Sequence, residues 1–217
     1  MERPAPGMKS AENTPPSAST GILLLAAGRS GRMGQPKQLM DWNGRPLLRH
    51  AAEQAIASGA APVMAVLGYE AARIRDCLAG LPVEIVENPS WEDGMGTTIR
   101  TGIQALAARG CPSVILTLAD QPLISSETYS RILEAHHRTG RPIVASSYAG
   151  TVGVPVLFAR SLYPDLLQLE PTQGCKGVIL IHREDAELIP CPEAECDVDT
   201  PADYERIRGS AVPSHSR

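Results

Sequence analysis

Two short, continuously apolar runs, Gly21–Ala26 and Ser113–Leu118, constrain the fold most strongly, and a polar loop follows each of them. A strand with one face in water alternates apolar and polar side chains, whereas a continuous apolar run requires burial on both faces. Strands of that kind occur in parallel sheets that carry helices on both sides. The two runs therefore predict an α/β fold.

Further elements alternate along the chain in the same rhythm. Apolar spacing predicts strands at 62–67, 83–87, 142–146 and 154–158, and helices at 46–58, 71–79, 96–108 and 125–137. Ser125 or Ser126 is the expected cap of the last helix. We expect one domain, residues 20–208, with a mainly parallel sheet, between a disordered leader at 1–19 and a disordered tail at 209–217. Its ligands should bind beyond the carboxyl ends of the strands.

The composition excludes several classes of function. With 20 basic and 24 acidic residues the net charge is -4, so no global positive field gathers nucleic acid. No apolar run approaches the roughly 20 residues of a membrane helix, and no signal peptide is evident, so we expect a cytoplasmic protein. The five cysteines form no C-x-x-C pair and should be mostly reduced. Cys191, Cys196 and Asp197 fit no common zinc spacing.

The loop after the first strand has the residues of a phosphate site. Its three glycines and three cations are Gly28, Gly31, Gly34, Arg29, Arg32 and Lys37. The glycines permit positive φ and close approach of backbone N–H groups to phosphate, and the cations supply charge. The spacing matches neither the P-loop nor the G-x-G-x-x-G pattern. A solvated basic turn is the alternative interpretation.

Carboxylates follow two later segments. Asp120 comes directly after the run Ser113–Leu118, on the same sheet edge as the glycine loop, and suits magnesium, which binds through one or two carboxylates and substrate phosphates. Its alternative role is to cap the next helix. Asp199 is assigned to the same metal, with Asp197 as a weaker candidate. Thr200 and Asp203 have the spacing of a helix cap.

In their order and distances, LAAGRSGRMGQPKQL, LADQP and DVDTPADY resemble the MobA-like nucleotidyltransferases, and within them the molybdenum cofactor cytidylyltransferases, from about residue 21 to 207. The resemblance implies a Rossmann-like fold, with Arg32 and Lys37 on the triphosphate and Asp120 on Mg²⁺. It also implies that four residues contact the nucleotide: Leu25, Ala26, Ala27 and Gly28. The resemblance also implies CTP as the nucleotide, because this chain has LAAG in place of the LAGG that is typical of the guanylyltransferase branch.

The segment NPSWEDGMGTT resembles another loop of that family. The resemblance implies that five of its residues line the nucleotide site: Asn88, Gly94, Met95, Thr97 and Thr98. Without it, 96–98 is a helix start with capping hydroxyls, and Trp91 is a packing residue.

One segment departs from the family. Relatives carry a G-D-x-G-A-R-like run on the acceptor side, where this chain has GCKGV with Cys175 and Val178. Three functions therefore compete: CMP transfer to molybdopterin, in the service of a molybdenum hydroxylase; nucleotidyl transfer to another phosphorylated acceptor, such as a sugar or alcohol phosphate; and a nucleotide-binding accessory role. Lys37 and Asp120 together favour an enzyme. Cys175 is expected to be an inert side chain.

Overall fold

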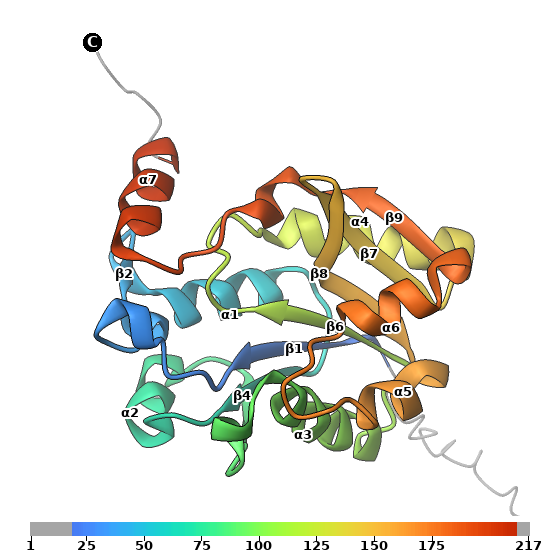
Figure 1. The fold of residues 1–217 in the computed structure, drawn as a ribbon, viewed down its shortest axis with the longest axis horizontal. Helices are drawn as coiled ribbons and strands as arrows, with labels where there is room; N and C mark the ends of the chain where they lie inside the picture. The colour runs from blue at the N-terminus through green and yellow to red at the C-terminus, as the bar shows by residue number, and fades with distance from the viewer. Residues whose placement is uncertain (1–18, 212–217) are drawn as a thin grey trace, which may run out of the picture.

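The computed structural model describes residues 19–211, which fold around a seven-stranded sheet in the order β5, β4, β1, β6, β8, β7, β9 (Figure 1). The strands are β1 Gly21–Ala26, β4 Val63–Leu67, β5 Val83–Glu87, β6 Ser113–Leu118, β7 Ile143–Tyr148, β8 Thr151–Ala159 and β9 Ala186–Pro190. All neighbouring pairs are parallel except the two that include β8. The prediction of a mainly parallel sheet is confirmed.

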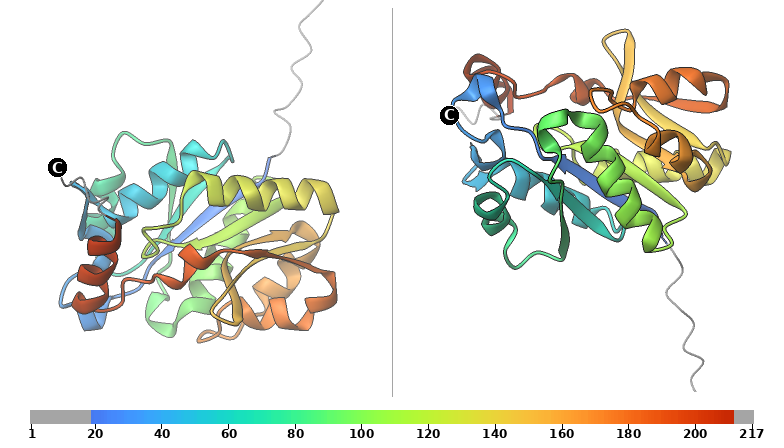
Figure 2. Two further views of the ribbon diagram at one scale, coloured as in Figure 1. Left: turned by 90° about the horizontal axis from the view of Figure 1, so that it is seen from above. Right: turned by 60° about the horizontal axis from the view of Figure 1, so that its bottom comes forward.

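Helices cover both faces of the sheet (Figure 2). One face carries α1 Leu47–Ala57, α2 Ala71–Arg75 and α4 Ser126–Thr139, and the other carries α3 Met95–Ala108, α5 Tyr163–Leu167 and α6 Lys176–Ile181. In β1, Ile22 and Leu24 pack in the first core and Leu23 and Leu25 in the second, all four at most 6% exposed. This double burial is why the run is apolar at every position.

The C-terminal segment is tied to the loop after β1 by a third apolar cluster. The small elements there are the 3₁₀ turns η1 Gly31–Met33 and η2 Lys37–Leu39, the paired strands β2 Asp41–Trp42 and β3 Arg45–Pro46, and helix α7 Pro201–Ala211. Trp42, Leu47, Val198, Tyr204 and Ile207 pack together with Met40. The Thr200 hydroxyl accepts from Asp203 N at 3.2 Å, which confirms the predicted cap of α7.

The predicted elements agree with the structure to within a few residues, except that 71–79 divides into α2 and the 3₁₀ turn η3 Asp76–Leu78. Ser125 is the N-cap of α4. The sequence interpretation missed α5, α6 and β9. Of the expected disordered termini, residues 1–18 and 212–217 lie outside the described part, while α7 extends to Ala211 within the expected tail. No helix within residues 19–211 is long and apolar enough to span a membrane.

Candidate functional site

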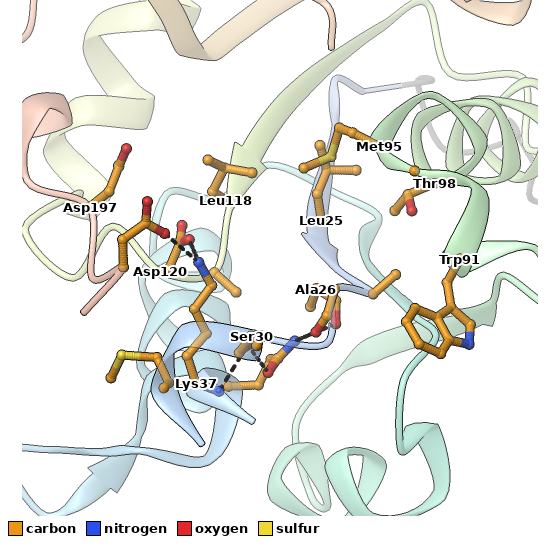
Figure 3. Close-up of a pocket in the computed structure, with 18 residues that line it drawn as sticks. Leu25, Ala26, Ser30, Lys37, Trp91, Met95, Thr98, Leu118, Asp120 and Asp197 are labelled. Carbon is orange, nitrogen blue, oxygen red and sulfur yellow. Dashed lines mark hydrogen bonds and ion pairs between the residues drawn. The ribbon is translucent and has the colours of Figure 1, made fainter. Parts of the chain in front are cut away.

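A pocket of about 460 Å³ opens at the carboxyl ends of β1 and β6, where α/β sheets bind ligands. Figure 3 shows Lys37, Asp120 and Asp197 on one side of it and Trp91 and Met95 on the other. Twelve of the residues proposed from the sequence line it: Leu25, Ala26, Ala27, Gly28, Gly31, Lys37, Gly94, Met95, Thr98, Asp120, Asp197 and Asp199. The pocket therefore joins three motifs that are distant in the chain.

The backbone of the glycine loop differs from the sequence interpretation. Ser30 (φ 58°) and Gly34 (φ 68°) take positive φ, whereas Gly28 and Gly31 do not. Neither positive φ nor crowding requires a glycine at position 28, because no atom lies within 4 Å of where its Cβ would stand. Since Gly28 lines the pocket, a side chain there would take up space open to a ligand.

Gln38, to which the sequence interpretation gave no role, holds this loop in shape. Its amide Nε2 donates to the carbonyls of Ala26 and Gly28, each at 2.9 Å, and the residue is 3% exposed. The Ser30 hydroxyl accepts from the backbone N–H of Lys37 at 3.1 Å. A polar side chain directly after the basic loop was the signal in the sequence, because a buried amide requires partners.

Lys37 connects the loop to the carboxylates. Its ammonium forms ion pairs with Asp120 and, at 3.2 Å, with Asp199 (Figure 3). Burial lowers the pKa of Lys37, but the charges of Asp120 and Asp199 outweigh that effect and hold the pKa above its ordinary value. Lys37 is therefore a permanent cation in the site.

Asp120 and Asp197 each have a buried oxygen, Oδ1, that no group within the described residues hydrogen-bonds. Burial, followed by the charge of Asp120, raises the pKa of Asp197 to about 6. Buried oxygens of this kind normally have partners, so these two are suited to a cation. Within residues 19–211 no cluster of three His, Cys, Asp or Glu residues forms a complete metal site. Asp120 and Asp197 thus offer oxygens suited to a divalent cation such as magnesium, whose other ligands would be phosphates and water. The assignment of Asp199 to the metal stays a prediction.

The opposite wall is formed by the start of α3. Gly94, Met95 and Thr98 line the pocket, but Asn88 and Thr97 do not. Asn88 Nδ2 donates to the hydroxyls of Thr97 at 2.8 Å and Thr98 at 3.1 Å. Asn88 and Thr97 therefore support the wall from outside the pocket. Their contact with a nucleotide stays a prediction.

The cations of the loop are not all placed alike. Arg32 lies in η1, and its side chain falls outside the described part of the structure. The Arg29 guanidinium lies 5.8 Å from the ring centroid of Tyr69, in a neighbouring cavity. Of the three cations, Lys37 is the one that the structure shows in the pocket.

The cysteines take no part in this pocket. Cys175 is buried, and burial raises the pKa of its thiol to about 12, which agrees with an inert side chain. Cys191 is buried in the first core, and Cys196 packs against the third cluster. Within residues 19–211 no zinc cluster forms around them.

A glycine loop after β1, a lysine and two carboxylates at one sheet edge define an α/β nucleotide-binding protein equipped for phosphate chemistry. The chain belongs to the family of the MobA-like NTP transferase domain, whose model matches residues 22–186. It is a nucleotidyltransferase, as its sequence resemblance implied.

Relatives of established name differ in function. The chain is 34% identical over 133 residues to the bifunctional protein GlmU of Kineococcus radiotolerans, covering 60% of this chain but only 27% of that protein. It is 32% identical to nicotine blue oxidoreductase of Paenarthrobacter nicotinovorans (83% and 92% covered). It is 22% identical to molybdenum cofactor cytidylyltransferase of Escherichia coli (84% and 92%).

Solved structures share the fold. The Rv0371c protein of Mycobacterium tuberculosis superposes with a TM-score of 0.74 at 28% identity, covering 89% of this chain and all of that one. A second structure of that protein, at TM-score 0.68 and 27% identity, is a complex with manganese and has the same coverage.

Proposed function

We propose that the protein transfers CMP from CTP to the phosphate of molybdopterin, with Mg²⁺, and releases pyrophosphate. The observation that carries this proposal is the convergence of Lys37, Asp120 and Asp199 beside the open glycine loop. The similarity to molybdenum cofactor cytidylyltransferase along most of both chains supports the choice of acceptor. The proposal includes a cytoplasmic location and delivery of the product to a molybdenum hydroxylase.

The two sides of the pocket suggest how a nucleotide lies in it. We place the triphosphate over the loop at Gly28, near Lys37, and the nucleoside toward Met95 and Trp91. The Trp91 ring is supported from below, because a Cβ at Gly68 would collide with it and Tyr69 packs edge-on at 5.4 Å. A supported wall of this kind would help to position the α-phosphorus for attack.

In the proposed reaction an oxygen of the acceptor phosphate attacks the α-phosphorus in line. A new P–O bond forms, the α–β bridging P–O bond breaks, and pyrophosphate leaves with the electron pair. Mg²⁺ bound at Asp120 and Asp199 would neutralise phosphate charge. Lys37, with Arg32 as its expected partner, offsets charge on the α-phosphate and on the leaving group. Phosphoryl transfer requires mainly positioning and charge, so no general base is needed.

Pyrophosphate release tests the proposal directly. The protein is incubated with Mg²⁺ and CTP, GTP, ATP or UTP, with and without molybdopterin. We expect release with CTP and molybdopterin together. Release with a sugar or alcohol phosphate instead would assign another acceptor, and nucleotide binding without release would indicate an accessory protein. An oxidoreductase, which is the named activity of one relative, would release no pyrophosphate.

A further inference from the structure

A second cavity, of about 620 Å³, lies against the hairpin that joins β7 and β8. Residues 147–152 of the hairpin form one side of it, and Lys176 and Leu180 of α6, with Arg183, form the other. Figure 2 shows the hairpin projecting beside α6. Within the described residues no carboxylate lines this cavity, although the chain carries a net charge of -4.

The two cations of this hairpin cavity are available to a ligand. Lys176 Nζ donates to the Thr151 hydroxyl at 2.5 Å, and within residues 19–211 neither Lys176 nor Arg183 forms an ion pair. By contrast Arg138, on α4, pairs with Glu187 at 2.9 Å. An unpaired guanidinium fork and an ammonium beside a hydroxyl are the groups that bind oxyanions in proteins.

The hairpin cavity lies at the same edge of the sheet as the pocket that holds Lys37 and Asp120. Tyr148 lines the former and Asp197 the latter. Strand β8 runs antiparallel to both β6 and β7, so the hairpin that holds Tyr148 lies at the same sheet edge as the carboxyl end of β6, which leads to Asp120. The charge of Asp197, after burial, also contributes to the raised pKa of Tyr148. Gly153 makes this position of Tyr148 possible, because a Cβ there would collide with the Tyr148 hydroxyl.

We propose that the hairpin cavity binds an anionic group of the acceptor other than the phosphate that attacks the nucleotide. The inference rests on the proposed transferase function and narrows its substrate class to acceptors with a second anionic group besides the phosphate, such as the dithiolate of molybdopterin. A simple alcohol phosphate has no group to reach Lys176 and Arg183. These two residues would therefore determine specificity through binding.

Steady-state kinetics with CTP and molybdopterin test the effect on the acceptor. We expect Lys176→Gln and Arg183→Gln each to raise the KM for the acceptor by about 10-fold, the scale of one hydrogen bond to a charged group. The KM for CTP and kcat should change less than about twofold, because neither side chain lines the nucleotide pocket. Arg138→Gln removes a similarly exposed cation elsewhere and is the matched control. An unchanged acceptor KM in both variants would overturn the inference.

A binding experiment keeps this inference separate from the transferase proposal. Inorganic phosphate is titrated into the ¹⁵N-labelled protein and amide shifts are followed by NMR. We expect shifts at 147–152 and 176–183 in the wild type and their loss in the Lys176→Gln/Arg183→Gln double variant, whose remaining spectrum reports an intact fold. Shifts confined to the loop at 28–37 would overturn the hairpin site. No turnover is required, so a failed assay for pyrophosphate does not decide the result.

Discussion

The ammonium of Lys37 lies between the carboxylates of Asp120 and Asp199 and donates a hydrogen bond to each. These are the two carboxylates that we assign to the metal. A divalent cation held by both carboxylates would take the place of the ammonium, which would then be free to bind the phosphates of the nucleotide. Lys37 therefore offsets part of the negative charge of the site.

The first prediction concerns this competition. We expect Lys37→Met to tighten the binding of Mn²⁺ without nucleotide by about two- to fivefold, the scale of a partly exposed ion pair. The affinity for CTP should fall by about 10- to 100-fold, since a charged hydrogen bond to phosphate is lost. Free Mn²⁺ is measured by electron paramagnetic resonance. Lys176→Met is the control for loss of an ammonium, and weaker Mn²⁺ binding in Lys37→Met would refute the competition.

The second prediction concerns Asp120, which has one buried oxygen without a partner within the described residues. Asp120→Asn should lower turnover by at least about 100-fold, because the charge that holds the metal at the reacting phosphates is removed. The Tm should change by only a few degrees, since the substitution is isosteric. Asp185→Asn alters an exposed carboxylate and should leave turnover unchanged. Wild-type turnover in Asp120→Asn would remove Asp120 from the metal site.

The sequence predicted the parallel strands well because each of them is short, apolar and buried on both faces. The run Gly21–Ala26 and the strand β6 have the predicted bounds. Helices α5 and α6 were missed because they have only five and six residues, too few to display helical periodicity. Strand β9 was missed because its first four side chains are only half-buried, so that AELIP carries a weak apolar pattern.

The sequence predicted the charged residues of the site, which belong to recognisable motifs. It did not predict the residues whose side chains hold other parts of the site in place. Lys37 and Asp120 converge as their positions after strands suggested, and Asp199 joins them as the sequence analysis expected. Gln38 and the left-handed Ser30 were not foreseen, because their roles depend on which carbonyls and amides the folded loop brings together. The local sequence does not show which hydrogen-bond partners a buried polar group will find in the folded chain.

The third prediction follows from the position of Gln38. Gln38→Ala should lower the free energy of unfolding by about 1–3 kcal/mol, because the carbonyls of Ala26 and Gly28 lose a buried donor. The KM for CTP should rise as the loop loses its shape. Urea unfolding and steady-state kinetics measure the two effects, with the exposed Gln35→Ala as control. Equal free energies of unfolding and equal KM values for CTP in Gln38→Ala and Gln35→Ala would contradict the role of Gln38 in holding the loop.

The fourth prediction uses the pKa of about 12 that burial imposes on Cys175. At pH 8 only about one thiol in ten thousand would be ionised, so iodoacetamide should spare Cys175 in the folded protein. The half-buried Cys196 should react first. Because the folded pKa is raised, the unfolded chain loses this proton first, and stability should decline as pH rises from about 9 toward 12. Peptide mass spectrometry after labelling checks the order, and fast modification of folded Cys175 would contradict it.

The placement of Asp199 depends on the cluster that ties α7 to the loop after β1. Val198 N donates to the carbonyl of Asp120 at 2.9 Å, and the side chain of Val198 is fully buried beside Trp42 and Ile207. Trp42 and Tyr204 pack with ring centroids 6.4 Å apart. The cluster thus fixes Val198, which directly precedes Asp199, and helix α7, which follows it.

Ile207→Ala tests this dependence. The side chain is 1% exposed, so its truncation should lower the free energy of unfolding by about 2–5 kcal/mol, or release α7 alone. In either case the affinity for Mn²⁺ should fall more than that for CTP, because Asp199 follows the cluster while the glycine loop is held separately by Gln38. Calorimetry gives both affinities, and Ile181→Ala, at an 80% exposed position, is the matched control. If Ile207→Ala bound Mn²⁺ as the wild type does, Asp199 would not depend on α7 for its position.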